Sequence, residues 1–237
     1  MGAGAVKGEE TSSPIGPSFS VFIPTYNAAC WLPCAIESVL NQTLKPVEII
    51  VADDGSTDNT AEVVSRYDGT CVRYRRFDHA GVYSVRNAML CELHGDWFIN
   101  LDADNWIEPD FLEKMEAAVS ASADSRLAFV YPDMLKFGDE SGTVIRPEFS
   151  VERLKLQNFI DMNSLVKTDI ARQFRFDPAF NSGQGDYDFF LTLAKNGYTG
   201  KALHGVKLHY RVHAGSISTE GRRKFRHVEL ARKILAK

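Results

Sequence analysis

The first 130 residues alternate between short apolar runs typical of β-strands and longer runs with the three-to-four-residue apolar spacing of helices. The strand-like runs are Phe19–Pro24, Val47–Ala52, Cys71–Tyr74, Trp97–Leu101 and Leu127–Tyr131. The helix-like runs are Trp31–Gln42, Ala61–Tyr67, Tyr83–Leu93 and Asp110–Ser120. Because such strands become parallel neighbours through right-handed crossovers, the order predicts an α/β fold with a mostly parallel sheet and helices on both faces.

The alternation stops after Tyr131. Short strand-like pieces with short helices between them follow at Met134–Phe137, Val144–Ile145 and Met162–Val166. Gly138 and Gly142 predict a hairpin between the first two pieces. A helix over Asp186–Asn196 and a last strand over Lys201–Val212 complete the pattern. We therefore expect one domain over residues 18–218, with a regular half (18–131) and a smaller, irregular α+β half (132–218).

The composition is that of a soluble globular chain. The 237 residues are 44% hydrophobic and carry a formal net charge of -4, which argues against nucleic-acid binding through a globally basic surface. No apolar run reaches the roughly 18 residues of a membrane-spanning helix, and the N-terminus lacks the apolar core of a signal peptide. We expect a cytoplasmic protein with a disordered leader over residues 1–17 and a basic amphipathic helix over 219–237. Residues 222–237 carry a local charge of +6.

The four cysteines, Cys30, Cys34, Cys71 and Cys91, form no CxxC pair and no cluster that would complete a zinc site. Cys30 and Cys34 lie four residues apart, on one side of a predicted helix, and we expect them to be buried free thiols. A reducing compartment follows as the default.

Three polar clusters come directly after strand-like runs: Thr25-Tyr26-Asn27, Asp53-Asp54 and Asp102-Ala103-Asp104. In an open α/β sheet the carboxyl ends of the strands form the ligand crevice, so these clusters are expected to meet in space. Their convergence is stronger evidence for a binding site than any one cluster.

Asp102 and Asp104 are carboxylates at a strand end, where oxygen ligands suit Mg²⁺ or Mn²⁺ held together with substrate phosphates. The alternative is a chance Asp-x-Asp triplet. A calcium loop fits worse, because Trp106 and Ile107 stand where an EF-hand needs a ligand and a glycine. The chain has neither a GxxxxGKS phosphate loop nor a GxGxxG motif after a strand, so a nucleotide would be held without them.

Several other polar residues have a structural and a functional interpretation. Asp58 fits a helix N-cap. Asp186 and Asp188 open a helix, where an acid is stabilised by the dipole, and alternatively one of them is a general base. His213, with Arg211 nearby, is either an ordinary hydrogen-bonded residue or part of an anion or metal site.

Taken together, the motifs resemble a family-2 inverting glycosyltransferase with the GT-A fold. The matching segments are SVFIPTYNAACWLPCAIESVLNQTLKPVEIIVADDGSTDNT, AGVYSVRN, GDWFINLDADNWIEPDFLEKM, GDYDFFLTLAKNGY and YRVHAGSIS, in this order. They cover most of residues 19–218. The resemblance implies a nucleotide-binding half over 18–131 and an acceptor half over 132–218.

The resemblance also implies a role for each matching residue. Pro24, Thr25 and Tyr26 would line the nucleotide base, and Asp54 would hydrogen-bond it. Arg86 would lie near the diphosphate and Asp102 near the ribose or a metal. The remaining roles are the main metal ligand (Asp104), the general base that deprotonates the acceptor (Asp186), and closure over the metal and diphosphate (Arg211, His213).

One departure is Gly185, which stands before Asp186 where the family usually carries Glu. The base is retained, but its acidic neighbour is missing, and this is expected to alter how the acceptor is held or how the base is tuned.

The sequence thus predicts a Mn²⁺- or Mg²⁺-dependent enzyme that moves a sugar, most simply from a UDP-sugar, to a carbohydrate or lipid-linked glycan acceptor. One alternative is an inactive nucleotide-sugar or glycan-binding module of the same fold. Another is a sugar-phosphate nucleotidylyltransferase, which should carry a Gly-rich basic loop after the first strand. Residues 24–28 contain neither glycine nor a basic residue. The tail over 222–237 would be either a solvated basic helix or a contact to anionic lipid.

Overall fold

The computed structural model describes residues 16–180, 184–214 and 236. Its strands are β1 (Phe19–Thr25), β2 (Glu48–Asp53), β3 (Val72–Arg76), β4 (Trp97–Asn100), β5 (Trp106–Ile107), β6 (Leu127–Gly138), β7 (Gly142–Val144), β8 (Leu165–Lys167) and β9 (Thr199–Val212). Its helices are α1 (Leu32–Leu40), α2 (Thr60–Ser65), α3 (Val82–Glu92), α4 (Phe111–Ser120), α5 (Val151–Leu156), α6 (Thr168–Phe174), the 3-10 helix η1 (Pro178–Phe180) and α7 (Gly185–Lys195). The predicted leader, apart from residues 16 and 17, and the predicted basic helix, apart from residue 236, lie outside the described residues.

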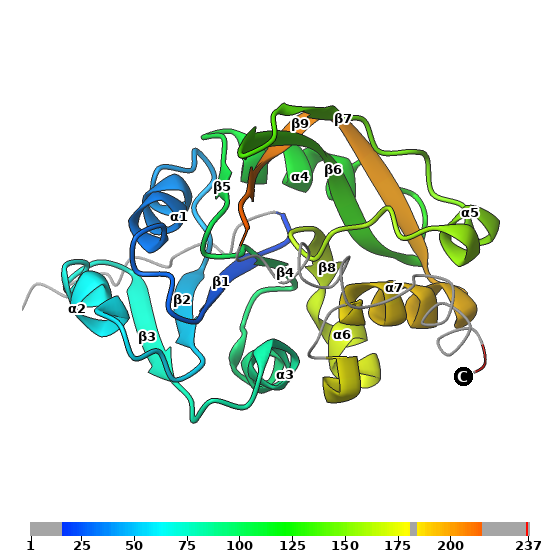
Figure 1. Ribbon diagram of the computed structural model, residues 1–237. Helices are drawn as coiled ribbons and strands as arrows, with labels where there is room; N and C mark the ends of the chain where they lie inside the picture. The colour runs from blue at the N-terminus through cyan, green and yellow to red at the C-terminus, as the bar shows by residue number, and fades with distance from the viewer. Residues whose placement is uncertain (1–15, 181–183, 215–235, 237) are drawn as a thin grey trace, which may run out of the picture.

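The strands form one sheet in the order β3-β2-β1-β4-β8-β6-β9-β5, and β7 pairs with β6 (Figure 1). Neighbours among β1, β2, β3 and β4 are parallel. Alternate side chains of β1 enter different cores: Val21 and Ile23 pack with α1, α2 and α4, whereas Phe22 packs with α3, α6 and α7. The predicted sheet with helices on both faces is therefore confirmed.

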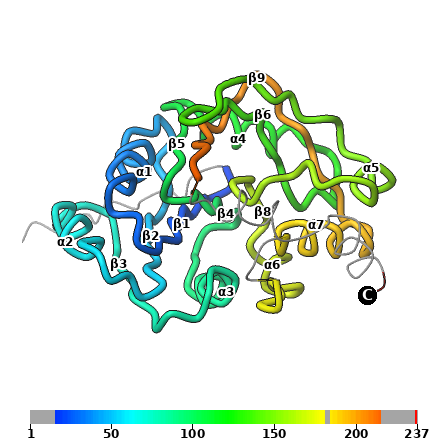
Figure 2. The backbone as a smooth tube through the Cα atoms, in the orientation of Figure 1, coloured from blue at the N-terminus to red at the C-terminus, as the bar shows by residue number. Residues whose placement is uncertain are grey.

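The second half is built on the long strands β6 and β9, which run parallel side by side (Figure 2). The sequence predicted Leu127–Tyr131 and Met134–Phe137 as separate strands, and this was wrong, because β6 is continuous. It passes Pro132 at a register shift against β9, where a residue without an N–H is tolerated. The predicted hairpin at Gly138 and Gly142 is confirmed by the antiparallel pairing of β6 with β7.

The prediction of buried thiols at Cys30 and Cys34 was wrong, since both cysteines are exposed. Cys30 precedes α1, whose buried residues are Leu32, Ala35, Ile36 and Val39. Both cysteines lie on the opposite side of the helix and line an open groove against Trp106 and Ile107. The four-residue spacing correctly placed the two cysteines on the same side, but it could not show whether that side faces the solvent or the core.

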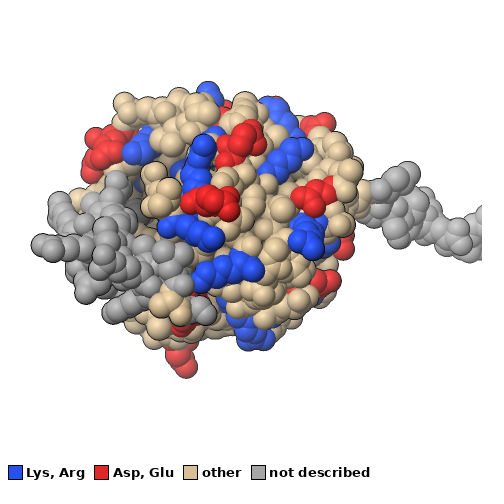
Figure 3. Space-filling model, turned by 90° about the vertical axis from the view of Figure 1, so that its right-hand side faces the viewer, with Lys and Arg blue, Asp and Glu red and all other residues tan. Residues whose placement is uncertain are grey.

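The charged side chains of the described residues form no large patch of a single sign in the view of Figure 3. On the face seen in Figure 3, the described Lys and Arg side chains are interspersed with Asp and Glu. Among the helices of the described ranges, none combines the length and the apolar character required to cross a membrane.

Candidate functional site

The three polar clusters lie at one edge of the sheet, as expected from the parallel strands. Thr25 at the end of β1 is in register with Asp53 at the end of β2, and the Asp54 N–H donates to the Thr25 carbonyl at 2.9 Å. β4 is the other neighbour of β1, and the N–H of Leu101, just after β4, donates to the Phe22 carbonyl at 3.0 Å. The segments that follow all three strands therefore lie side by side at this edge of the sheet.

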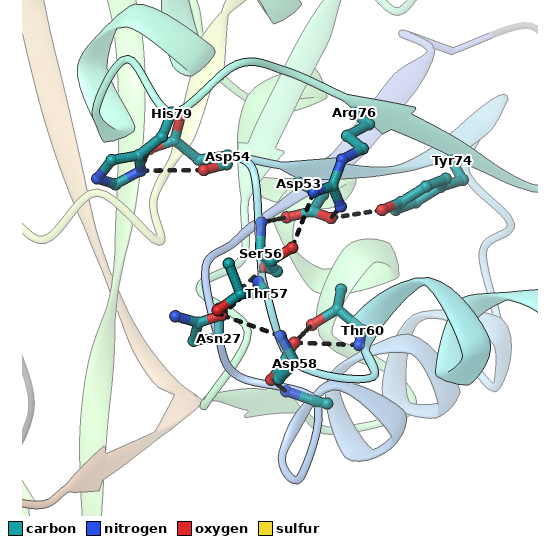
Figure 4. A network of polar contacts seen from close by, with 11 residues as sticks. Asn27, Asp53, Asp54, Ser56, Thr57, Asp58, Thr60, Tyr74, Arg76 and His79 are labelled. Carbon is teal, nitrogen blue, oxygen red and sulfur yellow. Dashed lines mark hydrogen bonds and ion pairs between the residues drawn. The ribbon is translucent and has the colours of Figure 1, made fainter.

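The loops after β1 and β2 are tied together by side-chain hydrogen bonds (Figure 4). Asn27 Oδ1 accepts from the Thr57 N–H at 2.8 Å, and Ser56 Oγ accepts from the Asn27 N–H at 2.9 Å. Asp58 accepts from the Ala29 N–H and from the N–H of Thr60, the first residue of α2. The N-cap position of α2 is Asn59, one residue after the predicted Asp58, but the Asp58 carboxylate still bonds the first N–H of the helix and also holds the neighbouring loop.

The adjacent acids Asp53 and Asp54 have different roles. Asp53 is fully buried and accepts from the Ser56 N–H, the Tyr74 hydroxyl and the Arg76 guanidinium, so it supports the turn (Figure 4). Asp54 accepts from the N–H groups of Ala80 and Gly81 at 2.8 and 3.0 Å and lies 3.1 Å from His79 Nδ1. Asp54 therefore fixes the loop that leads into α3.

An aromatic pair stands beside Asp54. The Tyr26 and His79 rings are stacked, with centroids 4.3 Å apart, and the Tyr26 side chain is 47% exposed. Thr25 Oγ1 is buried and has no hydrogen-bond partner among the described residues. A flat, exposed ring next to a buried hydroxyl without a partner is a suitable surface for a planar heterocycle.

Arg86 and Asp102 meet next to the end of β4. The Arg86 guanidinium is buried and donates to Asn100 Oδ1 at 2.7 Å and to Asp102 Oδ1 at 3.2 Å. Asn163, which lies 61 residues further along the chain, donates to Asp102 Oδ2 at 2.9 Å and accepts from the Asp102 N–H at 2.7 Å. Because both carboxylate oxygens are engaged, Asp102 is held in one orientation.

Asp104, Arg211 and His213 form a second group. His213 Nε2 lies 3.0 Å from Asp104 Oδ2, and Arg211 Nε donates to the Asp104 carbonyl at 3.2 Å. The Trp31 ring packs against His213 with centroids 4.3 Å apart. Burial and the neighbouring Asp102 charge raise the pKa of Asp104 to about 6, although His213 acts in the opposite direction.

Asp186 lies in the first turn of α7. Its carboxylate accepts from the Tyr187 N–H at 2.8 Å and from Asn158 Nδ2 at 3.2 Å. Burial and the charge of Asp161 raise the pKa of Asp186 to about 6, against the opposing effects of the Tyr187 N–H and the Arg86 charge. Such a carboxylate is mostly ionised at neutral pH, and its raised pKa makes it a stronger proton acceptor than an ordinary aspartate.

Sequence reasoning missed several residues of this site. Asn163 orients Asp102, and Asp161, whose pKa is raised by burial and by the Asp102 charge, lies near both Asp102 and Asp186. Trp31, His79 and Tyr83 contribute rings. Asp161, Asn163 and Ser164, polar residues at the start of the predicted strand Met162–Val166, were the available signal, but nothing local indicated their partners.

The residues present fit a divalent cation that shares its ligands with a substrate. Within residues 16–180 and 184–214, no group of three or more His, Cys, Asp or Glu is placed to hold an ion by itself. Asp104 and His213 offer one oxygen and one nitrogen side by side, with Asp102 close enough to raise the Asp104 pKa. Mg²⁺ and Mn²⁺ commonly use few protein ligands and take the rest from phosphate and water.

Several known proteins are similar to this chain in sequence. Chondroitin synthase of Pasteurella multocida strain Pm70 is 30% identical over 82% of this chain and 20% of its own length. Hyaluronan synthase of Pasteurella multocida is 31% identical over the same shares. The chain thus spans one fifth of these two relatives. An uncharacterized glycosyltransferase of Haemophilus influenzae is 30% identical over 76% of this chain and 72% of its own length.

Solved structures share the fold at low sequence identity. S. aureus TarS 1-349 in complex with UDP-GlcNAc has a TM-score of 0.76 and 18% identity over 92% of this chain and 64% of that chain. The mannosyltransferase PcManGT from Pyrobaculum calidifontis, in complex with GDP-Man and Mn²⁺, has a TM-score of 0.66 and 19% identity over 89% and 62%. The predicted GT-A fold is therefore confirmed. Residues 20–179 match the model of glycosyl transferase family 2, and the chain belongs to this family.

Proposed function

We propose that this chain transfers a sugar from a nucleoside-diphosphate sugar, most simply UDP-linked, to a hydroxyl of a glycan acceptor, with inversion at the anomeric carbon. The observation that carries the proposal is the Asp186 carboxylate, which is held by the Tyr187 N–H and Asn158 within electrostatic reach of Arg86, the residue paired with Asp102. A proton acceptor and a binding site for an anionic leaving group are the two parts that such a displacement requires.

The donor would lie across the strand ends. Pro24, Thr25 and the Tyr26 ring would line the base, with Asp54 hydrogen-bonding it, and Thr25 Oγ1 is available because it has no partner among the described residues. Arg86 would bind near the diphosphate, and Asp102 near the ribose or the metal. Arg211 would add positive charge from the other side, since it is held against Asp104.

Asp104 and His213 would hold Mn²⁺ or Mg²⁺, with Asp102 beside them. When bound, this cation would neutralise charge on the departing diphosphate. PcManGT, a neighbour of the same fold, has Mn²⁺ in its complex.

In the reaction, Asp186 takes the proton from the acceptor hydroxyl as that oxygen forms a bond to the anomeric carbon. The bond from this carbon to the diphosphate oxygen breaks in the same step, and the nucleoside diphosphate leaves with the electron pair. Attack opposite the leaving group inverts the anomeric carbon. The chondroitin and hyaluronan synthases among the relatives favour a polysaccharide or glycoconjugate acceptor.

The test is release of nucleoside diphosphate from a panel of UDP- and GDP-sugars by the purified chain in Mn²⁺, with and without oligosaccharide acceptors. Asp186→Asn should lower kcat by about 10²- to 10⁴-fold while the dissociation constant of UDP changes by less than about twofold. Asp188→Asn, two residues further along the same helix, is the matched control and should keep turnover near that of the wild type.

Two results would reject the proposal. If wild-type protein binds UDP but turns over no sugar nucleotide, the domain is a binding module. If Asp188→Asn abolishes turnover while Asp186→Asn does not, the base is misassigned.

A further inference from the structure

Gly185, the residue before the proposed base, is required by its surroundings rather than by its own backbone conformation. Its φ lies outside the positive range that favours glycine. A Cβ built on Gly185 would instead overlap the Tyr83 ring, with Cε2 and Cε1 at 2.6 and 2.7 Å. Real Cβ atoms do not approach an aromatic ring so closely, so the ring of Tyr83 occupies the space that any side chain at position 185 would need.

The Tyr83 hydroxyl binds the backbone at the start of α7. The Gly185 N–H donates to Tyr83 Oη at 2.9 Å, and the Asp186 backbone N–H also interacts with the phenol. The first N–H groups of a helix have no partner within the helix, so the phenol oxygen supplies one for the turn that carries Asp186. The Tyr83 side chain is buried, and burial with the Asp186 charge raises the pKa of its phenol to about 12, which keeps it neutral.

The Tyr83 ring also contacts Arg86, a residue proposed to lie near the diphosphate. The Arg86 guanidinium carbon lies 4.9 Å from the Tyr83 ring centroid, one turn further along α3. Arg86 in turn donates to Asn100 and Asp102. The Phe176 ring packs against Tyr83 with centroids 6.0 Å apart. Tyr83 is therefore the side chain that touches both the guanidinium at the diphosphate end and the backbone that carries the carboxylate.

We propose that Tyr83 is a positioning residue for catalysis, which through its hydroxyl fixes the first turn of α7 and sets the distance between the Asp186 carboxylate and Arg86. This inference rests on the proposed function, because it assigns a purpose to the base. It also explains Gly185. The Tyr83 ring fills the space next to position 185, so a large side chain at position 83 requires a residue without a side chain at position 185.

The first experiment removes the hydroxyl and keeps the ring. Tyr83→Phe should lower kcat by about tenfold or more, because misplacing a base by about 1 Å has large effects on rate. The donor KM and the dissociation constant of UDP with Mn²⁺ should stay within about twofold, since the ring under Arg86 remains. Tyr187→Phe is the matched control: it removes a phenol on the same helix that donates to the Lys155 carbonyl at 3.1 Å, and its kcat should be unchanged.

The second experiment tests the fit between positions 83 and 185 by stability, independently of turnover. Gly185→Ala alone should lower the melting temperature, because the new methyl group meets the ring. Tyr83→Ala alone should also lower it by leaving a cavity. The double variant should be more stable than the sum of the two single losses predicts, because each substitution relieves the other.

The outcomes separate this proposal from the one on which it rests. If Asp186→Asn is inactive and Tyr83→Phe has wild-type kcat, the positioning role is rejected while the proposed function stands. The positioning role is also rejected if Tyr83→Phe and Tyr187→Phe lose equal amounts of kcat. The same holds if the loss of melting temperature in the double variant equals the sum of the losses in the two single variants. If wild-type protein shows no turnover, the proposed function fails, and the positioning role fails with it.

Discussion

At the scale of single residues, burial gives Asp186 both the raised pKa that suits its proposed role as a base and a cost in stability. As a base it works only when ionised, and its pKa is raised to about 6 by burial and by Asp161. We therefore expect kcat to fall as the pH drops through about 6 and to level off above it. The measurement is kcat at saturating donor and Mn²⁺ from about pH 4.5 to 8.5. A flat profile over this range would contradict the assignment.

The same shift affects folding. The folded-state pKa of Asp186 lies above its ordinary value of 3.8, so the folded chain binds the proton more tightly than the unfolded chain. Asp186 therefore costs no stability below about pH 4, and its cost grows as the pH rises and is complete above about pH 6. Asp186→Asn should raise the melting temperature at about pH 7.5, and the gain should shrink towards pH 4. A gain that is independent of pH would show that the substitution acts through packing.

At the scale of secondary-structure elements, the pairing of β6 with β9 holds the second half together. Gly200 on β9 lies opposite Phe129 on β6, and a Cβ on Gly200 would lie 2.5 Å from Phe129 Cδ2. Gly200→Ala should therefore lower the free energy of unfolding by about 1–3 kcal/mol, measured by urea denaturation. The Phe129→Leu/Gly200→Ala double variant should lose less than the two single losses combined. If Gly200→Ala is as stable as the wild type, the strands can separate enough to admit a methyl group.

Local sequence patterns were sufficient to predict the longer helices and strands but not the shortest ones. Each strand and helix predicted in the first 130 residues is present, with ends that differ by at most two residues except for Leu127–Tyr131, which continues to Gly138. β5 has only two residues, and α5 and α6 have six and seven, too few for apolar spacing to be distinctive. These short elements are formed because their neighbours pack against them: Trp106 and Ile107 of β5, for example, pair with His209 and Leu208 of β9.

At the scale of the whole molecule, the proposed metal and nucleotide would be held by residues from both halves of the chain. Asp104 after β4 and His213 after β9 are the paired groups proposed to hold the metal, and the nucleotide would supply further ligands. Mn²⁺ alone should therefore raise the melting temperature little, and Mn²⁺ with UDP much more. At 100 times the dissociation constant the expected stabilisation is about 2.7 kcal/mol. The measurement is thermal unfolding with each ligand alone and with both together.

His213→Ala is the informative variant for this coupling. It should remove most of the extra stabilisation by Mn²⁺ with UDP while leaving the melting temperature of the free protein near that of the wild type, because His213 is partly exposed. His94→Ala is the control, because it removes an imidazole that also lies beside a carboxylate, that of Glu48, but before β4 rather than after its end. If Mn²⁺ alone raises the melting temperature as much as Mn²⁺ with UDP does, the protein binds the ion without the nucleotide. The proposal that the nucleotide supplies ligands to the ion would then be wrong.

The sequence by itself determined the strands and helices of the first half and the polar ends of its strands, because the spacing of apolar residues, the turn residues and the order of elements along the chain can be read locally. It also identified Asp102, Asp104, Asp186 and His213 as candidates. Only the tertiary structure decided which of them meet: His213 reaches Asp104 across 109 residues, Asn163 reaches Asp102 across 61, and Tyr83 reaches Gly185 across 102. Such contacts depend on sheet order, strand register and the side chains that fill the space between elements, and none of these is encoded in a local pattern.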